Sequence, residues 1–271
     1  MNRLRQCFDT LATTGRTALV PFVTAGDPSV DTTVDIMHAL VDAGADIIEL
    51  GIPFSDPMAD GPVIQLSSER AIERGVSLTT VLDNVHSFRQ NNQNTPVVLM
   101  GYLNPLYRMT FSVFATKAAT AGVDAVLVVD SPPEESSEFE ACLKQADISM
   151  IRLVAPTTTA ERMRLIAKNA GGFIYYVALK GITGAGSSNN ETASSLQRID
   201  TMRELSGLPV AAGFGIKDAE SAAAWAQVAD AVVIGSALVT RLAECSSSEQ
   251  ACDTVKSFLA PIRTAMDNVH K

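Results

Sequence analysis

The 271-residue sequence predicts an α/β fold, a closed (β/α)8 or TIM barrel with an extra N-terminal helix. Eight short apolar runs alternate with segments of helical periodicity, and the runs are almost continuously apolar, as strands are when both sheet faces are buried. A motif typical of a helix returning to a parallel sheet also occurs three times. The alternative is an open doubly wound sheet, which usually has about five to seven strands. No interdomain linker is evident, so we expect one domain over residues 1–271.

The first expected element is the extra helix over Asn2–Thr14. Apolar, largely β-branched runs then predict strands at Ala18–Val23, Asp46–Leu50, Val97–Gly101, Ala125–Val129, Met150–Val154, Phe173–Ala178, Pro209–Gly213 and Ala231–Ile234. Apolar residues three or four apart predict helices at Thr32–Asp42, Val63–Arg74, Thr79–Gln90, Phe111–Thr120, Ala160–Asn169, Ala219–Gln227 and Ala237–Leu242. A last helical segment runs through Phe258 and Ile262.

The repeated motif places an aspartate just before a strand. It occurs at residues 43–48, 121–126 and 228–233, where the aspartates are Asp46, Asp124 and Asp230. In the first two copies a glycine suited to a left-handed helix cap precedes the aspartate, and the third copy lacks it. The repeat indicates the same helix-to-strand junction used several times.

Composition and charge exclude several classes of partner. The net charge of −9 and the pI near 4.8 argue against nucleic acid or an anionic membrane. The N-terminus lacks the apolar core of a signal peptide and no apolar run reaches membrane-spanning length, so we expect a soluble, cytoplasmic enzyme. Four cysteines and three histidines show no metal-ligand spacing, and we expect neither a metal site nor disulfides.

Two acids lie on one unusual loop. Glu49 ends an apolar strand, where burial raises the pKa of a carboxyl group, and Asp60 follows on a loop that can swing over it. Three prolines and two glycines between residues 49 and 62 fix a specific loop shape. Either acid alone also fits a structural role, but together they indicate acid–base chemistry without a metal.

Glycine-containing turns follow the last three predicted strands. Glycine lets backbone N–H groups approach an anion, and barrels commonly bind phosphate at the loops after strands seven and eight. None of the turns is a dinucleotide or Walker motif. The turns are Thr183-Gly184-Ala185, Gly213-Phe214-Gly215 and Gly235-Ser236-Ala237, and the Ser236 hydroxyl is an extra donor.

Other residues near the strand ends fit an apolar slot above the core, although each also fits simple packing: Phe22, Met100, Leu127, Leu153 and Tyr175. The Gly/Ser/Asn-rich stretch 181–191 predicts a mobile loop at the same end of the barrel. Glu134 and Glu135 are interpreted as first-turn acids of a helix, and Asp27 as a turn residue.

Six motifs, in chain order, resemble those of the α chain of tryptophan synthase. They are Pro21-Phe22-Val23-Thr24-Ala25-Gly26-Asp27-Pro28, the run from Glu49 to Pro62, Tyr102-Leu103-Asn104-Pro105, Gly181-Ile182-Thr183-Gly184, Gly213-Phe214-Gly215-Ile216 and Gly235-Ser236-Ala237. The likeness extends from about residue 2 to residue 240. It implies a barrel that cleaves indole-3-glycerol phosphate to indole and glyceraldehyde 3-phosphate.

The resemblance also implies roles for individual residues. It implies Glu49 as the acid–base carboxylate and Asp60 as the carboxylate that stabilises charge at the indole N–H. Thr183 falls on the family's closing loop, and the remaining positions fall at the indole pocket (Phe22, Met100, Tyr102, Leu127, Leu153 and Tyr175), at the phosphate (Gly184, Gly213, Gly235 and Ser236), or toward a partner β chain (Asp56, Pro57, Asn104 and Pro132). The α chain would need no cofactor. The β chain would use pyridoxal phosphate to join indole with serine, in an α2β2 heterotetramer.

Three positions depart from the commonest family pattern: Ala178, Gly101 and Pro133. They lie apart from the two acids and the phosphate turns, so they bear on loop dynamics and partner affinity rather than on the reaction. Three other functions stay open from the residues: a Schiff-base aldolase using Lys180, an isomerase acting on a sugar phosphate, and a regulatory subunit that only holds a partner.

Overall fold

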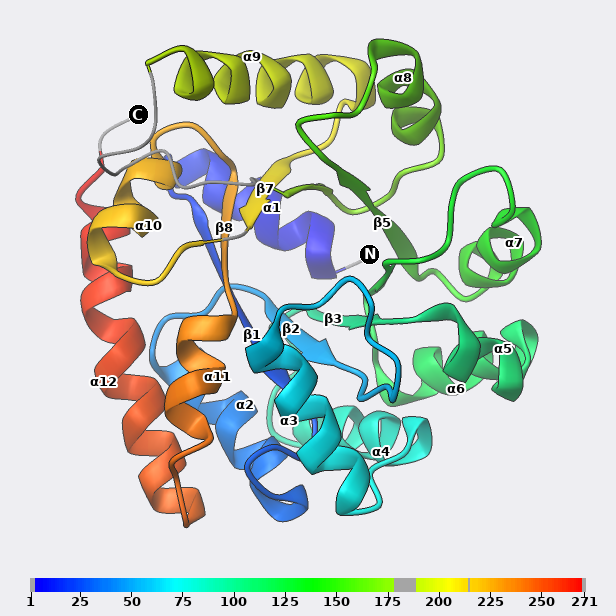
Figure 1. Cartoon of the computed structure of the whole chain (residues 1–271), viewed down its shortest axis with the longest axis vertical. Helices are drawn as coiled ribbons and strands as arrows, with labels where there is room; N and C mark the ends of the chain where they lie inside the picture. The colour runs from blue at the N-terminus through cyan, green and yellow to red at the C-terminus, as the bar shows by residue number, and fades with distance from the viewer. Residues whose placement is uncertain (1–2, 178–188, 214, 270–271) are drawn as a thin grey trace.

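The computed structural model describes residues 3–177, 189–213 and 215–269, and the strands in these ranges form a closed barrel surrounded by helices (Figure 1). All neighbouring strands are parallel and follow chain order, and β1 pairs with β8 to close the barrel. The strands are β1 Ala18–Thr24, β2 Ile48–Gly51, β3 Val97–Gly101, β4 Ala125–Val128, β5 Ser149–Val154, β6 Ile174–Val177, β7 Val210–Gly213 and β8 Ala231–Ile234. The predicted barrel is therefore confirmed.

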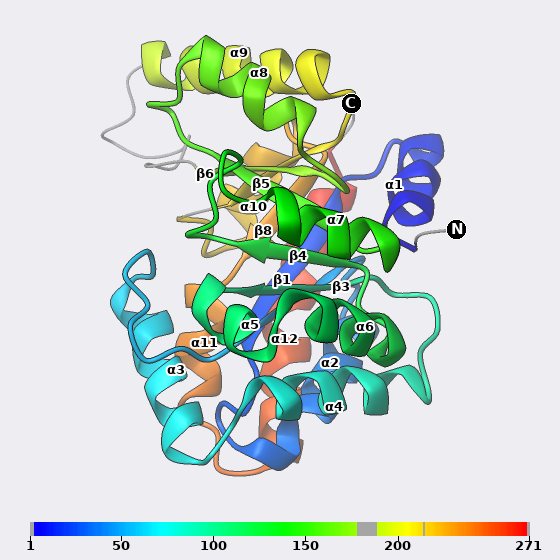
Figure 2. The same ribbon diagram turned by 90° about the vertical axis from the view of Figure 1, so that its right-hand side faces the viewer.

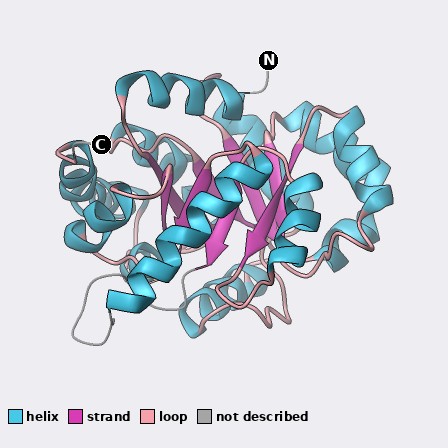
Figure 3. Ribbon diagram, turned by 90° about the horizontal axis from the view of Figure 1, so that it is seen from above, coloured by secondary structure: helices cyan, strands magenta, loops and turns pink. Residues whose placement is uncertain are grey.

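Helices cover the outside of the barrel, as the view in Figure 3 shows. They are α1 Arg3–Thr14, α2 Thr33–Asp42, α3 Pro62–Glu73, α4 Leu78–Arg89, α5 Leu103–Met109, α6 Phe111–Ala121, α7 Ser137–Gln145, α8 Ala160–Lys168, α9 Asn189–Ser206, α10 Ala219–Ala226, α11 Ser236–Leu242 and α12 Ser248–Asp267, with a 3-10 turn at Val30–Thr32. In the described part of the chain, no helix combines the length and apolar character that crossing a bilayer demands.

Two helices, α5 and α9, were not expected from the sequence, whereas α7 was expected only through the acids assigned to its first turn. The helix α5 has only seven residues, too few for a clear apolar stripe. The interpretation of Glu134 and Glu135 as first-turn acids is wrong, because both precede α7, and Glu138 and Glu140 occupy its first turn. Residues 189–191, expected in a loop, begin α9; the rest of that predicted loop lies outside the described residues.

The extra helix α1 closes the amino-terminal end of the barrel. Leu4, Phe8 and Leu11 belong to the same buried cluster as the inward-facing strand residues. Phe8 meets Phe173 edge to face, with ring centroids 5.8 Å apart. Figure 2 shows α1 on the side of the molecule opposite the loop that joins β2 to α3. The other end of the barrel is thus left for a cavity.

The repeated aspartates share one structural role. Each carboxylate accepts the N–H of a residue at the start of the neighbouring strand and pairs with an arginine from a helix. Asp46 binds the N–H of Leu19 and Arg263, Asp124 binds that of Val97 and Arg89, and Asp230 binds that of Val210 and Arg203, all at 2.8–3.1 Å. A charge-assisted bond of this kind fixes where one strand begins relative to the next.

Candidate active site

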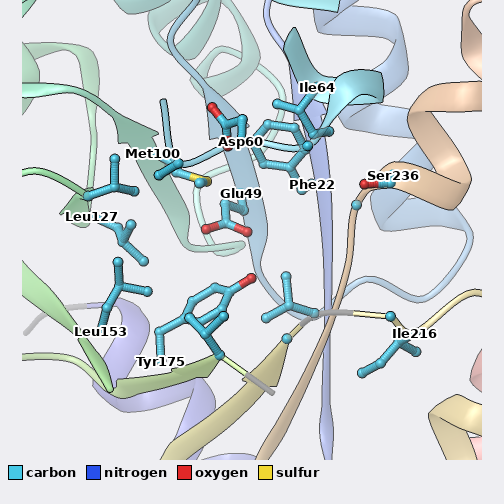
Figure 4. A pocket seen from close by; sticks show the side chains of 18 of the residues that line it. Phe22, Glu49, Asp60, Ile64, Met100, Leu127, Leu153, Tyr175, Ile216 and Ser236 are labelled. Atoms are coloured by element: carbon cyan, nitrogen blue, oxygen red, sulfur yellow. The ribbon is translucent and has the colours of Figure 1, made fainter. Parts of the chain in front are cut away.

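A cavity of about 480 Å³ opens at the carboxyl-terminal end of the barrel (Figure 4). It is lined by the predicted residues Phe22, Glu49, Asp60, Met100, Leu127, Leu153, Tyr175, Gly213, Gly235 and Ser236. Ile64, Ile216 and Lys217 also line it and were not predicted from the sequence. The rest of the lining consists of glycine, alanine and valine residues. Thr183 and Gly184 lie outside the described residues. The structure therefore brings together ten predicted residues that are far apart in the chain.

Glu49 is buried at the base of this cavity. The outward neighbours Ile48 and Leu50 pack against the helices, so the two-residue period of β2 turns Glu49 inward. Its side chain is 1% exposed, and neither carboxyl oxygen has a hydrogen-bond partner in the described part of the chain. Loss of solvation, followed by the charge of Asp60, raises the pKa of Glu49 to about 8. Glu49 can thus give or take a proton near neutral pH.

Asp60 is held by Tyr102, which is not among the cavity-lining residues. The Tyr102 hydroxyl donates to Asp60 Oδ2 at 3.0 Å and accepts the N–H of Ala59 at 2.9 Å. The Tyr102 ring stacks on Phe54 of the same loop, with centroids 5.0 Å apart. Burial raises the pKa of Asp60, whereas the bond from Tyr102 opposes that rise. Tyr102 therefore positions the acid and favours its ionised form.

The first turn of α3 also holds the loop that carries Asp60. Gln65 Nε2 donates to the carbonyl oxygen of Asp60 at 2.9 Å and to that of Pro57 at 3.3 Å. Ile64, in the same turn, lines the cavity. Loop and helix thus present one acid and one apolar side chain to the cavity together.

Tyr175 lies across the cavity from Asp60, and its hydroxyl points toward Glu49 (Figure 4). A Cβ atom on Gly213 would lie 2.3 Å from the Tyr175 hydroxyl oxygen, so this approach requires glycine at position 213. Burial, together with the charges of Glu49 and Asp60, raises the pKa of Tyr175 well above its ordinary value. The hydroxyl stays protonated and can donate a hydrogen bond.

The part of the cavity at the carboxyl ends of β7 and β8 suits an anion. Gly235 and Ser236 begin α11, where backbone N–H groups have no acceptor within the helix. Gly213 ends β7, and Lys217 adds a cation to the lining. A lysine four residues after Gly213, and two after the end of that predicted turn, was the signal that could have identified Lys217 from the sequence.

The four residues expected at a partner interface do not line the cavity. Asp56 and Asn104 are exposed, and Pro57 and Pro132 are half-buried. Two large apolar side chains near them are unusually exposed, Met58 at 77% and Tyr107 at 66%. Among the residues that the structure describes, no group of His, Cys, Asp and Glu side chains could hold a metal ion.

This fold and site define a (β/α)8-barrel enzyme whose reactive groups lie at the carboxyl ends of the strands. The family profile described as tryptophan synthase alpha chain matches residues 8–267. The tryptophan synthase alpha chain of Burkholderia ambifaria is 55% identical over 100% of this chain and 99% of the relative, and that of Xanthomonas euvesicatoria is 52% identical over 98% and 99%.

Solved structures agree with the sequence relatives. The crystal structure of tryptophan synthase subunit alpha from Legionella pneumophila superposes with a TM-score of 0.91 at 41% identity, covering 99% of this chain and 100% of that one. A chain of tryptophan synthase from Mycobacterium tuberculosis gives 0.87 at 30% identity, covering 98% and 99%.

The chain belongs to the tryptophan synthase alpha chain family. It is a lyase of tryptophan biosynthesis that cleaves indole-3-glycerol phosphate, as the resemblance implied. The α chain of this family needs no cofactor, and membership implies a β-chain partner.

Proposed function

We propose that Glu49 and Asp60 carry out the retro-aldol cleavage of indole-3-glycerol phosphate in this cavity. The observation that supports this most is the environment of Glu49, which is 1% exposed, lacks a hydrogen-bond partner among the described residues and faces an apolar cavity. A neutral carboxylic acid in that place is available to protonate carbon. Asp60 supplies the second carboxyl group, and the hydrogen bond from Tyr102 favours its ionised form.

The proton balance closes with these two residues. Protonated Glu49 delivers its proton to C3 of the indole ring, which places positive charge on the ring nitrogen, and the Asp60 carboxylate accepts the indole N–H and stabilises that charge. The side-chain hydroxyl then loses its proton to the Glu49 carboxylate as the carbon–carbon bond breaks. The bonding electrons return to the ring, so the products are indole and glyceraldehyde 3-phosphate, and Glu49 ends protonated as it began.

The rest of the cavity would bind and orient the substrate. The apolar side chains of Phe22, Met100, Leu127, Leu153 and Tyr175 form a wall suited to the indole ring. The backbone at Gly213, Gly235 and Ser236, with Gly184, would bind the phosphate, and Thr183 would help to close the site. Binding energy from the phosphate, remote from the reacting bond, would position that bond between the acids.

We further propose that the chain works in an α2β2 complex in the cytoplasm, as one domain. Asp56, Pro57, Asn104 and Pro132 would contact the β chain, which would hold pyridoxal phosphate and use the indole. The exposed Met58 and Tyr107 support this placement, because they follow the carboxyl ends of β2 and β3, next to the cavity. A partner there would also hold the Asp60 loop.

The test is indole release from indole-3-glycerol phosphate, measured with and without the β chain. Glu49→Gln should lower the rate at least 100-fold while binding of the β chain persists, because general acid–base groups typically contribute about 10²–10⁴-fold. Glu69→Gln, at an exposed acid of α3, is the matched control. Retained cleavage in Glu49→Gln, or turnover of a sugar phosphate but not of indole-3-glycerol phosphate, would refute the proposal.

A further inference from the structure

Arg152 is a charged side chain buried outside the barrel. Its neighbours Ile151 and Leu153 face the inside of the barrel, where Leu153 lines the cavity, so the two-residue period of β5 points Arg152 outward into the helix layer. The residue is 3% exposed, and Nε of its guanidinium has no hydrogen-bond partner in the described part of the chain. The reaction proposed above uses neither this residue nor its contacts.

The other two guanidinium nitrogens bind both ends of the segment between β4 and α7. Nη1 donates to the carbonyl oxygen of Ser131 at 2.6 Å. Nη2 donates to Ser136 Oγ and to Glu140 Oε1, and Ser136 Oγ lies 2.8 Å from the same carboxylate oxygen. One side chain thus fixes where the segment 131–136 begins, where it ends, and how the first turn of α7 is placed.

The same segment is joined to the start of α5. Asp130 Oδ1 accepts the N–H of Leu103, the first residue of α5, at 2.8 Å. Pro132 and Asn104 are therefore carried by one connected surface, and Figure 2 shows α5 and α7 on either side of β4. The exposed Tyr107 belongs to the same α5.

A buried guanidinium paired with a partly exposed carboxylate is a costly way to gain stability alone. Removing an arginine from water costs free energy, and apolar residues of similar size often serve stability equally well. What such a pair can add is one defined shape, because a guanidinium binds several acceptors in a fixed plane. Here the defined shape is that of an outward-facing segment.

We propose that the Arg152–Glu140 pair positions the docking surface for the β chain, by holding Pro132 and the 131–136 segment against α5. This inference rests on the partner interface proposed above and extends it to two residues outside the four proposed to contact the β chain. Arg152 points away from the cavity, so the pair acts on the affinity for the β chain and not on the chemistry of the isolated α chain.

The test compares Glu140→Gln and Arg152→Lys with wild type, and Glu138→Gln, an exposed acid in the same helical turn, is the matched control. Gln removes the charge from a partly exposed partner, and Lys keeps the charge but cannot bridge the same acceptors. Indole release is titrated with the β chain to obtain the concentration that gives half-maximal stimulation. We expect this concentration to rise about tenfold in both test variants and to stay unchanged in the control.

Cleavage by the isolated α chain supplies the readout that separates positioning from general damage. Its kcat and KM should stay within about twofold of wild type in Glu140→Gln. Unchanged half-maximal stimulation in Glu140→Gln would overturn the inference and leave the proposed function standing, and so would a parallel loss of cleavage by the isolated chain. If Arg152→Lys fails to fold, Glu140→Gln alone decides. A wild-type chain that does not respond to the β chain would overturn both this inference and the partner interface proposed above.

Discussion

Replacing Glu49 by Gln should make the protein more stable at alkaline pH while it abolishes cleavage. Glutamine has nearly the same shape as a neutral glutamic acid but carries no ionisable proton. The buried carboxyl oxygens of Glu49 have no hydrogen-bond partner among the described residues, so an amide in the same place loses no protein contact. The difference between the two proteins then reports mainly the cost of ionising Glu49 inside the fold.

The size of the effect follows from the pKa of Glu49, which rises from the ordinary value of 4.5, taken for the unfolded chain, to about 8 in the folded protein. Between these two pH values the folded protein holds a proton that the unfolded chain has released. The free energy of unfolding therefore falls as pH rises, by about 1.4 kcal/mol for each pH unit, and levels off above pH 8. The full loss approaches about 5 kcal/mol in wild type, and Glu49→Gln has no such loss.

The assay is urea unfolding of wild type, Glu49→Gln and the control Glu69→Gln at pH 5, 7 and 9. The two stabilities should be close at pH 5, and Glu49→Gln should exceed wild type by several kcal/mol at pH 9. The control should follow wild type throughout. A difference between Glu49→Gln and wild type that does not change with pH would refute the reasoning, since it would mean that Glu49 is not held neutral by burial.

Three further substitutions test the site and the fold. Tyr102→Phe should lower kcat/KM about tenfold, because it removes a hydrogen bond to Asp60; the pKa of that acid should rise further, moving the acid limb of the kcat/KM profile to higher pH, and an unmoved profile would contradict this. Ser236→Ala should raise KM for indole-3-glycerol phosphate about tenfold with little change in kcat, and steady-state kinetics showing the reverse pattern would place Ser236 in the chemical step. Asp124→Ala should lower the free energy of unfolding by about 3–5 kcal/mol, because it removes the carboxylate that pairs with the buried Arg89. The control Asp9→Ala breaks an exposed pair and should cost less than about 1 kcal/mol; equal losses in urea unfolding would contradict the role of Asp124 at the helix-to-strand junction.

Several features of the site followed from local sequence patterns. The apolar run before Glu49 predicted a buried strand, and the place of Glu49 at the end of that run predicted a carboxyl group among apolar neighbours with a raised pKa. The glycine turns at Gly213 and Gly235 could be assigned to one end of the barrel because parallel strands all end on the same side. These predictions required only the order and period of residues along the chain.

Other features depend on contacts between distant segments. Nothing near Asp60 in the sequence indicates that its partner is Tyr102, 42 residues away. The ion pair between Arg152 and Glu140 likewise needs β5 and α7 to pack side by side. The short helix α5 was missed because it is stabilised by packing, such as the contact of Tyr107 with Phe111 of α6, more than by any clear apolar stripe of its own.

By itself, the sequence determined the barrel, its eight strands, the two acids and the turns suited to phosphate, because hydrophobic period, glycine turns and strand-end acids are written locally. Only the tertiary structure decided which side chains meet: Tyr102 with Asp60, Tyr175 over Gly213, and Lys217 at the anion end of the cavity. The physical reason is that closing a barrel sets the spacing between strand ends to within a hydrogen-bond length, and no local pattern carries that spacing.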